Sequence, residues 1–188
     1  MAMKTKQELK DVFSGLSSIM LVKGGIKNFA TVSPDFDLPV TVDTLSLNQA
    51  EPTLNRTKVH GLDADWAVTS TAGDITFAAT VPSISKDLVA YFLGESNDVA
   101  TATVNGVAYE GFSATLRSKK INVGFAFLSE DGDKCLLVKK MAIYARPLFE
   151  NASTTPFGFA LSGTIEIEDG TLDSSTDDNI AFLTKKAA

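Results

Sequence analysis

Apolar and polar residues alternate along much of this chain, which is typical of strands that bury one face. The alternation is clearest at residues 66–68, 75–81 and 121–127, and a mostly apolar run follows at 135–146. A period of two predicts β-strands at these places. The last two runs flank the polar turn SEDGDK, so they predict a hairpin. We therefore expect a mainly β chain.

Residues 66–94 predict a hairpin that leads into a helix. The turn would be Thr71-Ala72-Gly73-Asp74, and each flanking run would give one apolar face to a core. Pro82 stops the second strand, and Gly94 suits the left-handed end of a helix at about residues 83–93. Ser83 or Ser85 would cap this helix. Its expected buried face is formed by Ile84, Leu88, Tyr91 and Phe92.

Several other elements follow from shorter patterns. Thr5 and Glu8 have capping-box spacing before an apolar helical stripe that ends at Leu16, which predicts a short N-terminal helix. Residues 18–22 predict a first strand. Residues 37–47 predict one long strand with a bulge near position 43, and 157–167 predict a last long strand. Residues 100–116 have weaker strand patterns.

Residues 48–61 predict a long surface hairpin loop, because they are polar and contain Pro52. Two interpretations remain open. The segment is either a tolerated solvent loop or a contact loop that reaches a neighbouring subunit. In the second case Pro52 lies in the contact segment, Leu54 and Val59 supply apolar contacts, and Arg56 supplies a pairing charge.

Composition and charge narrow the function classes. Of the 188 residues, 44% are hydrophobic and 21% charged, as in an ordinary globular domain. The net charge of −6 and the lack of a basic stripe disfavour tight nucleic-acid binding. The single cysteine, Cys135, excludes an internal disulfide and predicts a buried thiol. No secretory signal pattern opens the sequence, so we expect folding in a cytoplasm.

Catalytic and metal-binding patterns are weak, and we expect no enzyme, cofactor or metal. The one histidine, His60, has no nucleophile motif beside it, so a loop histidine is favoured over a general base. Glu130-Asp131-Gly132-Asp133 lacks the spacing of an EF-hand and predicts a turn. For the acidic residues Asp35, Asp37, Asp63 and Asp65, solvation in loops is favoured over acid–base chemistry.

The arrangement from about Leu38 to Glu168 resembles the major tail proteins, or tail tube proteins, of long-tailed bacteriophages. The resemblance rests on the Gly-Asp turn in GDITFAATVP, the helix SISKDLVAYFLG, the late hairpin and the closing PFGFALSGTIEIEDG. It implies an antiparallel β-sandwich or rolled β-barrel with one flanking helix. It also implies three parts: an arm and first strand at residues 1–30, a tail-tube-like domain at 31–169, and an acidic tail at 170–188.

The resemblance further implies a function in the virion. Copies made in the cytoplasm of the host bacterium would form rings, commonly of six, that stack into a hollow tube for genome delivery. DNA would pass through without specific binding, and the acidic net charge suits such a conduit. The long loop and the terminal segments would make contacts between rings. Tape-measure and tail-completion proteins are further candidate partners.

Two other classes remain open on the sequence. The first is a non-catalytic β-sandwich that binds a carbohydrate or a protein, with Tyr109, Phe112 or Tyr144 as an aromatic platform. The second is a hydrolase with a site around His60, which would require further catalytic residues that no motif reveals.

Overall fold

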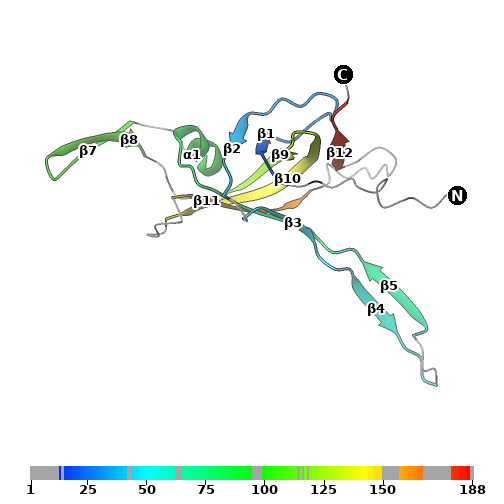
Figure 1. Cartoon of the computed structure of the whole chain (residues 1–188). Coiled ribbons are helices and arrows are strands. Elements are labelled where there is room, and N and C mark those ends of the chain that lie inside the picture. The colour runs from blue at the N-terminus through cyan, green and yellow to red at the C-terminus, as the bar shows by residue number, and fades with distance from the viewer. Residues whose placement is uncertain are drawn as a thin grey trace. The chain divides into compact units, whose positions relative to one another are not determined.

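The computed structural model describes residues 13, 15–41, 44–61, 65–94, 99–113, 115, 117, 119–149, 157–166 and 179–186. These residues form twelve strands and one helix, so the expected mainly β, antiparallel fold with one helix is confirmed. Closure into a barrel is not observed among the described strands, because the main sheet runs in the order β2-β1-β9-β10-β11-β6-β3 and has two different edges. Two further sheets are hairpins, β4-β5 and β7-β8 (Figure 1).

The chain divides into two compact units. The first comprises residues 1–39, 123–140 and 167–188, and the second comprises 40–122 and 141–166. Strands β9 (Lys120–Leu128) and β10 (Lys134–Leu148) contribute residues to both units. Because β9 and β10 are neighbours in the main sheet, the hairpin predicted from the runs at 121–127 and 135–146 is confirmed, and β10 continues beyond the second run to Leu148.

In the first unit, β1 (Ser18–Lys23) pairs with β2 (Phe36–Leu38) and with β9. The connection between β1 and β2 folds over one face, where buried Ile26 packs with Ala126 and Leu137. The amide of Ile26 donates to the carbonyl of Lys139 at 2.7 Å, which ties this connection to β10. β12 (Ile180–Thr184) pairs with the start of β10. A strand thus forms in the segment expected to be a tail.

In the second unit, β6 (Ile75–Val81) lies between β3 (Ser46–Gln49) and β11 (Gly158–Ile165). Alternate residues of β6 and β11 are buried on one face. The helix α1 (Lys86–Leu93) packs there, with the rings of Phe92 and Phe159 5.1 Å apart in an edge-to-face contact. The opposite face carries small and polar side chains.

The helix begins and ends as expected. Ser85 caps it by accepting a hydrogen bond from the amide of Leu88, and Gly94 ends it in the left-handed conformation. The buried face differs in part from the predicted one, because Val89 and Leu93 are buried with Leu88 and Phe92, whereas Ile84 precedes the helix and is 44% exposed.

Two predictions of strand pairing are wrong. Residues 37–47 do not form one bulged strand. The strand β2 ends at Leu38 and pairs with β1, whereas β3 begins at Ser46 and pairs with β6. Likewise, Thr71–Asp74 is not a hairpin turn. β5 (Ala67–Thr71) pairs with β4 (Thr53–Thr57), while β6 pairs with β3 and β11. The predicted N-terminal helix lies almost entirely outside the described residues.

The turn between β9 and β10 has a buried hydroxyl at its centre. Ser129, 1% exposed, donates from its hydroxyl to the Asp131 carboxylate at 2.5 Å and accepts from the amide of Lys134 at 2.9 Å. The hydrogen bond from Ser129 is the main cause that lowers the pKa of Asp131, and a bond from the amide of Asp133 adds to it. The predicted turn is confirmed, and the Asp131 carboxylate accepts hydrogen bonds within it.

We predict that Phe92→Ala lowers the free energy of unfolding by about 3–5 kcal/mol, because it removes a fully buried ring and leaves a cavity against Phe159. Ile84→Ala, at a half-exposed position, should cost less than about 1 kcal/mol. Equilibrium urea unfolding of both variants measures the difference. Equal losses would show that the helix is not anchored through Phe92.

We predict that Ser129→Ala lowers the free energy of unfolding by about 1–2 kcal/mol at neutral pH, since the amide of Lys134 loses its acceptor. The lowered pKa of Asp131 stabilises the fold above the pKa of the unfolded chain, and this contribution is lost as pH falls. The deficit of the variant should therefore shrink below about pH 4. Urea titrations over the acid range check this, and a deficit that is constant with pH would contradict it.

Candidate assembly surfaces

The two hairpins of the second unit carry several exposed apolar side chains. Each is a separate two-stranded sheet, and nearly all of its side chains are exposed. A two-stranded ribbon has no layer of its own to cover an apolar face, and isolated hairpins are marginally stable in water.

The predicted loop at 48–61 is instead part of a long ribbon. Its strand β4 pairs with β5 in the register Leu54 with Ser70 and Arg56 with Val68. Partners in such a register point to the same side. The amide of Ala50 donates to the carbonyl of Asp74 at 2.9 Å, so the ribbon continues directly into β3 and β6. The polar composition of residues 48–61 and Pro52 had favoured a loop over these strands.

One face of this ribbon carries Leu54 and Val68 beside Arg56 and Ser70, and the other face is polar apart from Ala67. Leu54 is 50% exposed and Val68 54% exposed, and both lie on the face that also carries Arg56. Trp66, at the bend just before β5, is 71% exposed. The opposite face consists of Thr53, Asn55, Thr57, Ala67, Thr69 and Thr71. We refer to Leu54, Arg56, Trp66 and Val68 as the ribbon face.

The ribbon face corrects one expectation about Trp66 and Val68. Alternation had predicted that they face the core, but no described segment covers them. Of the predicted contact residues, Leu54 and Arg56 lie on the ribbon face, Pro52 is exposed just before β4, and Val59 is exposed at 39% in the tip region. The guanidinium of Arg56 pairs with the Asp65 carboxylate at 3.1 Å. This charge is thus partly satisfied within the hairpin.

The second hairpin was missed as a candidate site. It joins β7 (Val99–Val104) to β8 (Val107–Phe112) through Asn105 and Gly106, both with positive φ. Such a turn matches the right-handed twist of paired strands, and the Asn-Gly pair is its strongest sequence signal. That pair could have identified the hairpin from the sequence. One face is apolar throughout: Ala100, Ala102, Val104, Val107, Tyr109 and Gly111.

The aromatic platform proposed from the sequence is not assembled on this hairpin. Tyr109 pairs in register with Ala102, whereas Phe112 pairs with Val99, so the two rings point to opposite faces. Tyr144 lies on β10 beside a shallow hollow that is also lined by Ala78, Thr80 and Ser162. These three aromatic residues therefore do not form one flat binding surface.

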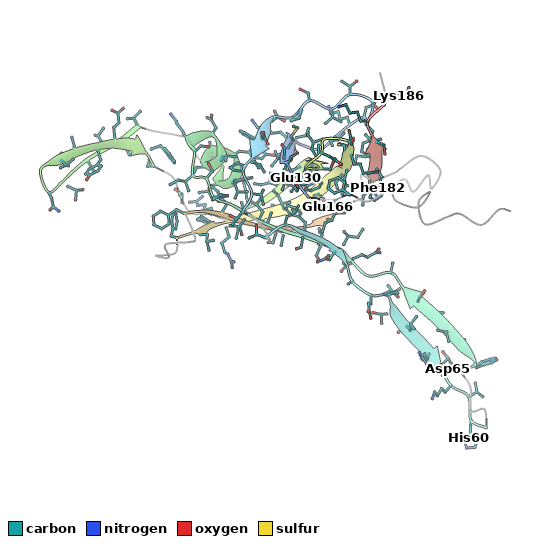
Figure 2. All side chains as sticks on the ribbon, viewed as in Figure 1. His60, Asp65, Glu130, Glu166, Phe182 and Lys186 are labelled. Carbon is teal, nitrogen blue, oxygen red and sulfur yellow. The ribbon has the colours of Figure 1, made fainter. Side chains whose placement is uncertain are left out.

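Among the described residues, the polar side chains considered for catalysis are either exposed or engaged in hydrogen bonds to nearby segments. His60 is exposed near the tip of the ribbon (Figure 2). Asp35 accepts from the amide of Lys23, and Asp37 accepts from the hydroxyl of Ser18, both at 2.7 Å. Asp63 lies outside the described residues. Burial raises the pKa of the Cys135 thiol, which disfavours the reactive thiolate.

Within the described residues, no three His, Cys, Asp or Glu side chains are grouped to hold a metal ion. The described segments also contain no helix that is long and apolar enough to cross a bilayer. The ribbon face and the apolar face of β7-β8 are exposed apolar surfaces of the kind that often contact other protein chains.

Comparisons with known proteins leave the family open. Neither the protein-family models nor the curated proteins gave a match to this chain.

Proposed function

We propose that this chain is a structural subunit that self-assembles through its exposed hairpins into stacked rings, and that these rings form the tail tube of a bacteriophage. The observation that carries the proposal is the ribbon face. Leu54 and Val68 place about half of their surface in solvent on one side of a strand pair, and Trp66, at the end of that pair, is 71% exposed. Contiguous exposed apolar surface of this kind marks protein interaction sites.

A neighbouring copy is the partner favoured by the form of this surface. Both hairpins have unpaired outer strand edges among the described residues, and main-chain groups on such edges readily pair with another chain. In a closed ring every copy uses the same surfaces, so the exposed edges and apolar faces of each copy are covered by its neighbours. The resemblance to tail tube proteins gives this assembly its proposed place in the virion.

The acidic surface supports the conduit function. With a net charge of −6, the chain has no excess of cations with which to hold DNA by counterion release. A tube of such subunits would let the genome slide past without retaining it. DNA is thus a passing partner, while the tape-measure and tail-completion proteins are candidates for contacts at the ends of the tube.

Negative-stain electron microscopy with light scattering tests the proposal. We predict that the purified protein forms rings or tubes with a central hole at high concentration. The triple variant Leu54→Thr, Trp66→Ser and Val68→Thr should shift the scattering mass to a single chain, because it removes the apolar surface of the ribbon face and keeps residues that tolerate strands.

The control alters the other side of the same ribbon. Thr53→Ser, Asn55→Ser and Thr69→Ser should assemble like the unchanged protein, since these residues lie on the polar face. Loss of assembly in both variants would attribute the effect to ribbon stability rather than to the apolar face. A wild-type protein that stays a monomer at all concentrations would favour the binding-module class.

A further inference from the structure

The strand β12 occupies an edge of β10 that could be filled equally well by another copy. Its ladder runs from the carbonyl of Asp133, which accepts from the amide of Lys185 at 2.7 Å, to the amide of Lys139, which donates to the carbonyl of Asn179 at 2.8 Å. These main-chain bonds are the same whichever chain supplies the strand. Strand addition at an open edge is a common form of protein association.

Side-chain packing adds little that would hold β12 to its own chain. Ala181 packs beside the buried group of Ile26, Ala126 and Leu137. The next residue, Phe182, points to the other side and is 81% exposed (Figure 2), and Leu183 is 43% exposed. The strand is therefore held chiefly by its backbone ladder and by two partly buried side chains, Ile180 and Ala181.

The chain length before β12 is much greater than its position requires. β11 ends with Ile165 opposite Met141, and β12 begins with Ile180 opposite Val138, so only Lys139 and Lys140 lie between on β10. Three residue steps of a strand span about 10 Å. Residues 166–179, fourteen in number, connect the two strands. Fully extended, fourteen residues would reach about 46–50 Å.

We propose that the edge of β10 formed by Lys134–Val138 accepts the β12 strand of a second copy of this chain. Exchange of an identical element is a low-cost route to association, because the native contacts are kept. A linker of this length gives the strand an effective concentration on the order of mM at its own chain. The β12 strand of another copy therefore competes with a chain's own β12 only where the local concentration of copies is similarly high. The proposed assembly would supply that concentration, so this inference rests on the proposed function.

The native cysteine provides a direct test. Cys135 faces Leu183 in the register of β10 and β12. The pairs Asp133–Lys185 and Lys139–Asn179 are joined by main-chain bonds, and such bonded pairs alternate with non-bonded ones along an antiparallel ladder. Cys135 and Leu183 therefore form a hydrogen-bonded pair, with Cα atoms about 5.5 Å apart. This spacing is the usual one for a disulfide. The single variant Leu183→Cys should thus form a disulfide on mild oxidation, within one chain or between two.

A mixture isolates exchange between chains. The wild-type protein supplies Cys135 and is mixed with the double variant Cys135→Ser/Leu183→Cys, so that the designed disulfide can form only between two different chains. The mixture is assembled, or concentrated to mM if no assembly occurs, and then oxidised. We predict a shift to a two-chain mass on non-reducing gel electrophoresis, with the disulfide mapped to positions 135 and 183 by mass spectrometry.

The matched control moves the new cysteine by one position. Cys135→Ser/Phe182→Cys places the thiol opposite Leu136 on the other side of the strand, so it should give no mapped disulfide to Cys135. The pair Lys134→Cys and Thr184→Cys, in neighbouring register and distributed over two chains that both carry Cys135→Ser, repeats the test should Leu183→Cys disturb β12.

The outcomes separate this proposal from the proposed function. A disulfide confined to single chains in the Leu183→Cys variant, with no two-chain product in either mixture, would overturn strand exchange, even if microscopy shows tubes. A mapped two-chain product without rings or tubes would support exchange and count against the tail tube. Both together would make β12 one of the contacts that join the subunits.

Discussion

Strand β10 is the element on which the main sheet depends. Its 15 residues pair with β9 along one side, and with β12 and then β11 along the other. The strand carries buried Val138, Met141 and Ile143, so that its backbone bonds and its apolar side chains act together. Because so much pairing converges on one strand, disruption of β10 would remove a pairing partner from three strands, β9, β11 and β12.

Local signals in the sequence predicted the elements whose boundaries depend on nearby residues. Ser85 and Gly94 fixed the two ends of the helix because capping and left-handed termination are properties of a few adjacent residues. The turn after β9 was predictable for the same reason. The partners of β5 and β6 could not be predicted, since alternation looks the same in a hairpin and in one long ribbon. Which strands pair depends on segments that are distant in the sequence.

The candidate surfaces were predicted in part. The sequence placed Leu54 and Arg56 in a contact segment, but it assigned Trp66 and Val68 to the core, because an apolar face gives no indication of whether another layer will cover it. The hairpin around Asn105 and Gly106 could have been predicted from its turn residues alone. What the sequence could not give was its exposure, which depends on whether any other segment of the chain folds over it.

The junction between the ribbon and the sheet has a mechanical consequence. At Gly73 the strands approach so closely that an added Cβ would lie 2.0 Å from the carbonyl oxygen of Ala50, which leaves no room for a side chain. Directly beyond it, the amide of Ala50 donates to the carbonyl of Asp74 and leads into β6, whose Phe77 is buried in the core. A load on the ribbon would therefore reach the core along β6, through a junction whose two strands are in close contact.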